Sequence, residues 1–205
     1  MWNESSPEED RELVVRCREG DSLAFEELVR KYQQSVLNLV YHYIGSRGDI
    51  EDIAQKIFIK IYFSVPKFNV KRPFFPWLYR IAINQCYDEL RRIRRRKTYT
   101  FSELNLEDTA SIERIIGCSD TAGRSEQHEA DMQALLQKIL SQLPDNQRKV
   151  IILRDIEAIP YAEIAAILKC TEQAARLKVF RARNRLKKIL EKFLPQSNTN
   201  KTLHP

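Results

Sequence analysis

Apolar residues that recur every three or four positions limit most strongly what this chain can fold into. The longest such run comprises Phe25, Leu28, Val29, Tyr32, Val36, Leu39, Val40 and Tyr43. That spacing places all of them on one face of an α-helix. No segment alternates polar and apolar residues long enough to indicate a strand, and the 205 residues include only 5 glycines. The sequence therefore predicts an all-α fold.

Capping residues and prolines divide this helical pattern into segments. Gly20 suits a left-handed C-terminal cap, Asp21 can cap the next helix, and Pro66 denies the backbone further helix. In the first half we expect helices over Glu8–Glu19, from Asp21 to near Gly45, over Ile50–Ser64 and over Phe74–Lys97. A polar, acidic stretch from Thr98 to about Gln127 lacks periodicity and is typical of a linker. Apolar spacing returns at Met132 and predicts a second helical domain.

Charge is distributed in blocks that follow this division. Residues 1–60 carry 8 basic and 12 acidic groups (net −4), residues 61–97 carry 10 and 2 (+8), residues 98–145 carry 3 and 9 (−6), and residues 146–205 carry 13 and 5 (+8). Two basic blocks separated by an acidic one indicate two separate contacts with a polyanion. We therefore predict two small helical domains, at residues 1–97 and 129–194, joined by an acidic flexible linker at 98–128 and followed by a frayed tail at 195–205.

The residue types that commonly bind metals or perform catalysis are scattered along this sequence. The four cysteines are separated by 69, 32 and 52 residues, and the three histidines are His42, His128 and His204. This spacing predicts no disulfide framework, zinc site, cofactor or enzymatic centre. The N-terminus is polar and no run approaches 18 apolar residues, so secretion and membrane insertion are not expected. We expect a soluble, cytoplasmic protein that is not an enzyme.

The stretch from Phe74 to Lys97 combines aromatic and cationic side chains on one expected helix. The rings are Phe74, Phe75, Trp77 and Tyr79, and the cations are Arg91, Arg92, Arg94, Arg95, Arg96 and Lys97. Rings stack on bases, at roughly 1–3 kcal/mol per base, and cations hold phosphates, so the pattern favours single-stranded nucleic acid. The alternative is that the rings pack in a core and the basic run is a solvated face. The residues alone leave both interpretations open.

A helix-turn-helix pattern follows in the second domain. Leu143, Pro144 and Asp145 open one helix; then Tyr161–Leu168 predicts a short helix, Lys169 and Cys170 a tight turn, and Thr171 the cap of a basic helix that runs from Glu172 to about Lys192. Ile164, Ala165, Leu168, Ala175 and Val179 are expected to pack the two helices together. Gln173, Arg176, Leu177, Lys178 and Arg181 would then face outward, where an arginine can reach base edges in the major groove. Lys169 stands where such turns often have glycine, and a left-handed residue with a side chain costs about 1 kcal/mol there.

Taken together, these stretches resemble a known family, the bacterial RNA polymerase sigma factors of the extracytoplasmic-function, or group 4, type. DIEDIAQKIFIKIY at Asp49–Tyr62 and PFFPWLYRIAINQCYDELRR at Pro73–Arg92 are similar to the family's region 2. LPDNQRKVIILRDIEAIPYAEIAAIL, with the later FRARNRLKKIL, is similar to region 4. The resemblance covers both domains in their order, and it implies a factor that directs RNA polymerase to promoters and melts them.

The resemblance also implies roles for individual residues. Docking on the coiled coil of the largest polymerase subunit falls to Asp49, Glu51, Asp52 and Gln55. Contacts with the minus-10 element fall to Lys67, Phe68, Asn69, Lys71, Arg72, Phe74, Phe75, Trp77, Tyr79, Arg80, Asn84, Arg91, Arg92 and Arg95. Contacts with the minus-35 duplex fall to Thr171, Gln173, Arg176, Leu177, Lys178, Phe180 and Arg181. The implied partners are core RNA polymerase, including the flap of its second-largest subunit, promoter DNA and an anti-sigma factor.

Two positions depart from the family pattern. Lys56 follows Gln55 where the family frequently has an acidic residue, and the recognition helix begins TEQAARLK in place of the common small residues and glycine. The positions of the base contacts can therefore be carried over, but the promoter sequence cannot. The alternative hypothesis is a free-standing helix-turn-helix regulator, which would bind a duplex operator tightly without polymerase.

Overall fold

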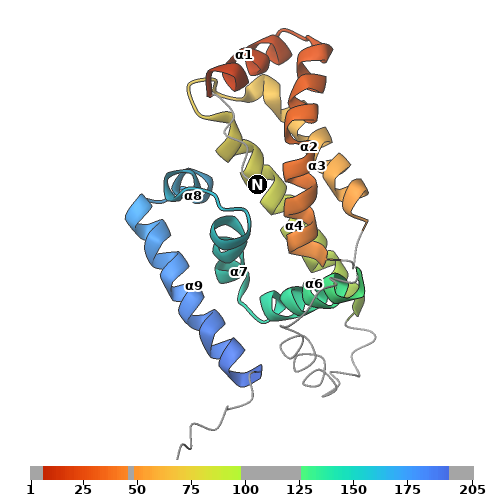
Figure 1. Cartoon of the computed structure of the whole chain (residues 1–205). Coiled ribbons are helices and arrows are strands. Elements are labelled where there is room, and N and C mark those ends of the chain that lie inside the picture. Colours follow the sequence, from red (N-terminus) through yellow and green to blue (C-terminus); the bar gives the residue numbers. More distant parts are fainter. Residues whose placement is uncertain (1–6, 46–48, 98–125, 194–205) are drawn as a thin grey trace, which may run out of the picture.

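The computed structural model describes residues 7–45, 49–97 and 126–193, and these residues form helices and short connections (Figure 1). In chain order the elements are α1 (Pro7–Arg18), α2 (Ser22–Ile44), α3 (Ile50–Ser64), the 3-10 turn η2 (Val65–Lys67), α4 (Phe74–Lys97), α6 (Glu126–Ser141), α7 (Asp145–Ile151), the π-helical turn η3 (Ile152–Ile156), α8 (Tyr161–Leu168) and α9 (Glu172–Phe193). The predicted all-α fold is confirmed. We call α1–α4 the N-terminal bundle and α6–α9 the C-terminal bundle.

Local capping sets the ends of the helices in the N-terminal bundle. The Asp21 carboxylate accepts hydrogen bonds from the backbone N–H groups of Leu23 (2.9 Å) and Ala24 (3.2 Å), and the Asp49 carboxylate accepts one from Asp52 (3.0 Å). These bonds satisfy N–H groups that have no partner within a helix. Gly20 and Gly45, which end α1 and α2, both have positive φ. The capping roles predicted for Gly20 and Asp21 are therefore confirmed.

The C-terminal bundle contains the predicted helix-turn-helix. Lys169, between α8 and α9, has φ 52° and ψ 50°, the left-handed conformation. Thr171 caps α9, because its hydroxyl accepts a hydrogen bond from the N–H of Ala174 at 3.2 Å. Ile164, Ala165, Ala175 and Val179 are buried between α8 and α9, as predicted. The region after Ile151 differs from an ordinary helix, since it widens into the π-helical turn η3.

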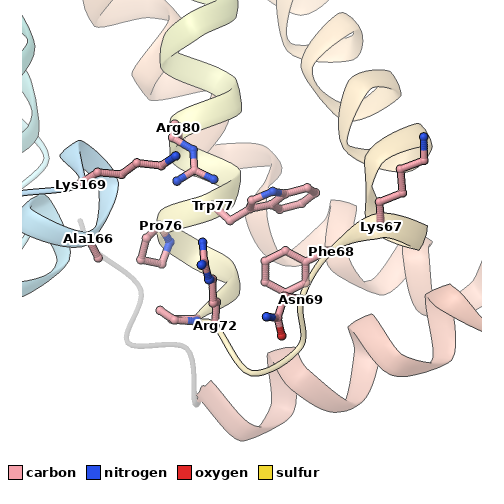
Figure 2. A pocket seen from close by; sticks show the side chains of 10 residues that line it. Lys67, Phe68, Asn69, Arg72, Pro76, Trp77, Arg80, Ala166 and Lys169 are labelled. Atoms are coloured by element: carbon pink, nitrogen blue, oxygen red, sulfur yellow. The ribbon is translucent and has the colours of Figure 1, made fainter.

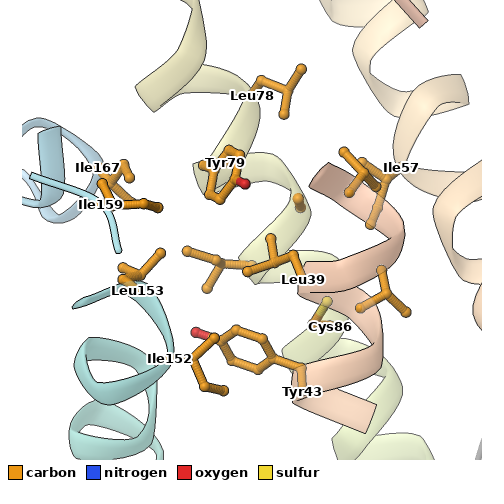
Figure 3. Close-up of a cluster of buried hydrophobic side chains, with 14 of the residues drawn as sticks. Leu39, Tyr43, Ile57, Leu78, Tyr79, Cys86, Ile152, Leu153, Ile159 and Ile167 are labelled. Carbon is orange, nitrogen blue, oxygen red and sulfur yellow. The ribbon is translucent and has the colours of Figure 1, made fainter. Parts of the chain in front are cut away.

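The two bundles pack against each other through one continuous apolar core. Figure 3 shows Tyr79 of α4 facing Ile159 and Ile167 of the C-terminal bundle, and Tyr43 of α2 beside Ile152 of η3. All five residues are at most 2% exposed. Burial of this apolar surface stabilises the arrangement by roughly 25 cal/mol per Å².

Polar contacts join the bundles at the C-terminal end of α2. The Arg148 guanidinium of α7 donates to the Tyr43 carbonyl at 2.6 Å, and the Gln137 amide of α6 donates to the carbonyls of Tyr41 (3.1 Å) and His42 (3.2 Å). The His42 ring also lies 2.8 Å from the buried Glu157 carboxylate. The Tyr41 carbonyl also accepts from the N–H of Gly45, but carbonyls at a helix end generally lack partners within the helix, and the other bundle supplies donors to His42 and Tyr43. We call this group of contacts the α2 cap.

The linker predicted at 98–128 lies mostly outside the described residues, and so does the predicted tail at 195–205. α6 begins at Glu126, so the last three residues assigned to the linker are helical. Among the described helices, none combines the length and the apolar character needed to cross a bilayer.

Candidate nucleic-acid interface

A cavity of about 520 Å³ lies beside the loop that precedes α4 (Figure 2). Its lining combines two aromatic rings with four cations: Phe68, Trp77, Lys67, Arg72, Arg80 and Lys169. The loop is held by a turn in which the Asn69 side chain accepts a hydrogen bond from the N–H of Lys71 at 3.0 Å. Lys67, Asn69, Lys71 and Arg72 are exposed. The loop therefore presents cations around a ring-lined hollow large enough for a nucleotide base.

Several predicted minus-10 contacts are core residues in this structure. Phe74, Phe75 and Tyr79 are 3%, 8% and 2% exposed, and Phe68 is also buried except where it lines the cavity. The rings of Phe75 and Tyr79 lie 4.2 Å apart, and burial raises the pKa of the Tyr79 hydroxyl far above its ordinary value. The packing alternative that the sequence left open therefore applies to these rings. Trp77 is half-buried, with its ring centroid 4.7 Å from that of Phe68.

Trp77, Arg80, Asn84 and Arg91 follow one face of α4. Their spacing of three, four and seven residues brings each to nearly the same side of a helix. Asn84 and Arg91 are exposed and line a second cavity of about 590 Å³ between the bundles, together with Lys149 of α7. The Lys149 ammonium lies 4.7 Å from the centre of the Tyr87 ring, and burial lowers its pKa. This face of α4 offers a row of polar groups that could follow a nucleic-acid strand.

The arginines at the end of α4 differ in their contacts. Arg92 is bonded to Glu89 at 2.6 Å, and Glu89, which is buried, lies 3.8 Å from Lys56 of α3. Arg92 and Lys56 thus offset the cost of burying a carboxylate between α3 and α4. Arg91 and Arg95 are exposed and available to phosphate.

The four predicted polymerase contacts lie at the start of α3. Asp49, Glu51 and Gln55 are exposed, and Asp52 is partly covered by its ion pair with Lys56. The lysine that departs from the family pattern therefore neutralises one of the predicted docking acids. The same helix also exposes Ile59, Tyr62 and Phe63, the last with 73% of its surface accessible. Sequence reasoning missed this apolar surface.

α9 carries the predicted minus-35 contacts on its exposed side. Thr171, Gln173, Arg176, Leu177, Lys178, Phe180 and Arg181 are all exposed. The Arg176 guanidinium is held by the Glu172 carboxylate at 2.6 Å and lies 4.4 Å from the centre of the Tyr161 ring. Leu177 and Phe180 can make apolar contacts with thymine methyl groups, while arginine can pair with guanine. The arrangement can read a duplex in the major groove.

Comparison with known proteins gives the family. Residues 28–96 match Sigma-70 region 2, and residues 133–186 match Sigma-70, region 4. The RNA polymerase sigma-H factor of Pseudomonas aeruginosa is 32% identical over 191 residues, which cover 93% of this chain and 98% of that protein. The chain belongs to the sigma-70 family. The sigma factor is of the extracytoplasmic-function type, and it is also similar to the ECF RNA polymerase sigma-E factor of Escherichia coli K12, with 33% identity over 85% of this chain and 90% of that protein.

Two solved structures share the fold of the sigma factor. CnrH in complex with the cytosolic domain of CnrY is 24% identical, with a TM-score of 0.63 over 90% of this chain and 98% of that one. The sigma factor RpoE of Bartonella quintana, in complex with the anti-sigma factor NepR, is 23% identical, with a TM-score of 0.57 over 82% of this chain and 96% of that one. Sigma factors direct RNA polymerase to promoters and are not enzymes.

Three functional candidates in the sigma factor were missed from the sequence: Lys149, Arg148 and Lys169. Lys149 and Arg148 belong to α7, but their partners Tyr87 and Tyr43 lie in the other bundle. Contacts between residues about 60 to 105 positions apart leave no periodic signal in the sequence. Lys169 did leave a signal, because a lysine at the glycine-preferring position of the turn is unusual.

Proposed function

We propose that this sigma factor binds core RNA polymerase through α3, reads the minus-35 element as duplex with α9, and holds the unpaired minus-10 strand at the loop before α4. The observation that carries the proposal is the pairing of two different nucleic-acid surfaces on one chain. One is an exposed recognition helix, and the other is a ring-lined cavity rimmed by cations. A recognition helix suits the major groove of a duplex, and a ring-lined cavity suits a base that has been extruded from the duplex.

Promoter melting would follow from capture of unpaired bases. Extruding a base costs a few kcal/mol, and a pocket with a stacking surface offsets that cost. The cavity beside Trp77 and Phe68 would take one base, and Arg80 and Asn84 would hold the strand along α4. Arg91 and Arg95, which are exposed farther along α4, would add phosphate contacts that increase affinity without choosing a sequence.

Docking on polymerase would use both bundles. Asp49, Glu51, Asp52 and Gln55 would contact the coiled coil of the largest subunit, and the exposed side chains of Ile59, Tyr62 and Phe63 would extend this surface. The C-terminal bundle would contact the flap of the second-largest subunit, which sets its distance from the N-terminal bundle. Two weak DNA contacts spaced correctly gain affinity through effective concentration. The sigma factor would act in the cytoplasm, with an anti-sigma factor restraining it.

Reconstitution with cognate core polymerase tests the proposal. We expect the purified chain plus core enzyme to start transcription on fragmented genomic DNA at a small set of positions that share minus-35 and minus-10 sequences, as mapped by sequencing RNA 5′ ends. Core enzyme alone is the control and should not select these positions. Tight, sequence-specific binding of a duplex by the chain alone, with no start sites conferred on core enzyme, would contradict the proposal.

A further inference from the structure

The cavity beside the α4 loop is built by both bundles. Lys67, Arg72 and Arg80 come from the N-terminal bundle, whereas Ala166 and Lys169 come from α8 and the turn that follows it. The described residues that line the cavity include no aspartate or glutamate. Within the described ranges, these four cations form no ion pair with a carboxylate. The cavity therefore concentrates positive charge that the described side chains do not neutralise.

The backbone conformation at Lys169 sets the direction of its side chain, which lines this cavity. Its φ of 52° is left-handed, a conformation that is unfavourable for a residue with a Cβ and that glycine adopts freely. Figure 2 shows the Lys169 side chain extending from the C-terminal bundle toward Arg80 on α4. A glycine would make the same turn without the strain, so the helix-turn-helix itself does not need the lysine. The side chain instead brings a cation to the other bundle.

Two cations directed toward each other repel unless an anion lies between them. A phosphate group satisfies both, because arginine and lysine are the usual donors to its oxygens. Trp77 and Phe68 line the same cavity and offer ring faces for a base. The lining therefore offers cations for a phosphate and rings for a base, the two chemical parts of a nucleotide, and a volume of about 520 Å³ lies within the range of small-molecule sites.

We propose that the packed form of this protein has a nucleotide site shared between the bundles, in which a phosphate lies between Arg80 and Lys169 and a base lies against Trp77. The ligand class is a nucleotide, either free or as part of a single strand. The inference rests on the proposed minus-10 role of the N-terminal bundle and adds a residue of the C-terminal bundle to it. The packed form then binds a single strand more tightly than the N-terminal bundle would without Lys169.

Binding of two probes to the full chain tests this site. The probes are a fluorescent pool of random-sequence single-stranded DNA hexamers and unlabelled dAMP as a competitor. We expect Lys169→Gly to weaken hexamer binding about fivefold and to reduce the slope of log affinity against log salt by roughly 0.7, the value for one phosphate contact on a single strand. Lys169→Arg should retain wild-type affinity. Displacement by dAMP identifies a free nucleotide as a ligand, and its failure to compete restricts the site to strands.

The controls distinguish loss of the nucleotide site from loss of folding and from loss of the proposed sigma-factor function. Lys169→Gly relieves the left-handed strain, so its thermal midpoint should equal or exceed that of the wild type. Arg30→Ala removes an exposed cation of α2 outside the cavity and should leave hexamer binding unchanged. Unchanged or tighter binding by Lys169→Gly, or no hexamer binding by the wild type, would overturn the inference. Transcription with core polymerase, measured in parallel, reports the proposed function independently.

Discussion

The ring of Tyr161 at the start of α8 contacts two arginine side chains of the C-terminal bundle, Arg154 and Arg176. The guanidinium carbons of Arg154 and Arg176 lie 4.6 Å and 4.4 Å from the centre of its ring. Arg154 also donates to the Ile159 carbonyl at 3.0 Å, while Arg176 is held by Glu172. A guanidinium held by a ring and a carboxylate loses less freedom when it meets a base. We therefore expect Arg176 to make the direct base contact in the proposed minus-35 interface.

Replacing Arg176 with alanine tests this role. We expect roughly tenfold less transcription from promoters that need the minus-35 element, because one bidentate base contact contributes about 1–3 kcal/mol. Promoters that depend only on the minus-10 element should be little affected. In vitro transcription on paired templates measures both, with Arg185→Ala, an exposed arginine farther along α9, as the control. An equal loss on both templates would mean that Arg176 contacts phosphate alone.

At the scale of the element, α3 divides its surface between the core and the proposed docking face. Ile53, Ile57 and Ile61 are buried, whereas Glu51 and Gln55 are exposed. Acidic residues in the first turn favour the helix because they lie near the positive end of its dipole. The acids of the proposed docking face thus stabilise their own helix while remaining exposed.

Charge reversal at Asp52 tests the docking face. We expect Asp52→Lys to weaken binding to core polymerase about tenfold or more, since it removes an acid and faces the partner with a new cation. The fold should persist with a loss of about 1 kcal/mol from the Lys56 pair and the helix dipole. Fluorescence anisotropy with labelled sigma factor measures binding, and Glu26→Lys, the same charge reversal at an exposed acid of α2, is the control. Unchanged affinity would remove Asp52 from the docking surface.

Local sequence signals predicted the elements well, and the reasons are visible in particular residues. Asp21, Asp49 and Thr171 cap helices through bonds within three residues, so their effect is encoded locally. The exposure of the aromatic side chains in the first turns of α4 was harder to predict. Phe75 packs against Tyr32 and Tyr79 within the N-terminal bundle, and Tyr79 also faces the C-terminal bundle, whereas Trp77 between them remains half-exposed. Periodicity identified the helix but could not show which ring faces solvent.

At the scale of the whole molecule, the packing of the bundles was not predictable from local pattern. Arg148 reaches the Tyr43 carbonyl across 105 positions, and His42 reaches Glu157 across 115. In the sequence, Arg148 is one more cation of a basic block, a class that usually remains solvated. Only the fold shows that it is 4% exposed.

Replacing Arg148 with methionine tests how the bundles are held together. The change keeps most of the apolar stem but leaves the Tyr43 carbonyl without this charged donor, at a cost of about 2 kcal/mol. We expect a larger radius of gyration in small-angle X-ray scattering, because the bundles separate more often. Arg154→Met is the matched control, since Arg154 bonds within its own bundle and should alter stability without changing size. An unchanged radius for Arg148→Met would show that the apolar contacts suffice.

The α2 cap makes the end of α2 a reporter of how often the two bundles separate. Gln137 approaches the end of α2 so closely that a Cβ at Gly45 would lie 3.2 Å from its side chain, and the carbonyls of Tyr41, His42 and Tyr43 are bonded to the other bundle. When the bundles part, the carbonyls in the last turn of α2 lose these hydrogen-bond donors, and the turn frays. Amide hydrogen exchange at Tyr43, Ile44 and Gly45 should then proceed at the rate of bundle separation, while the middle of α2 remains protected until the whole N-terminal bundle unfolds.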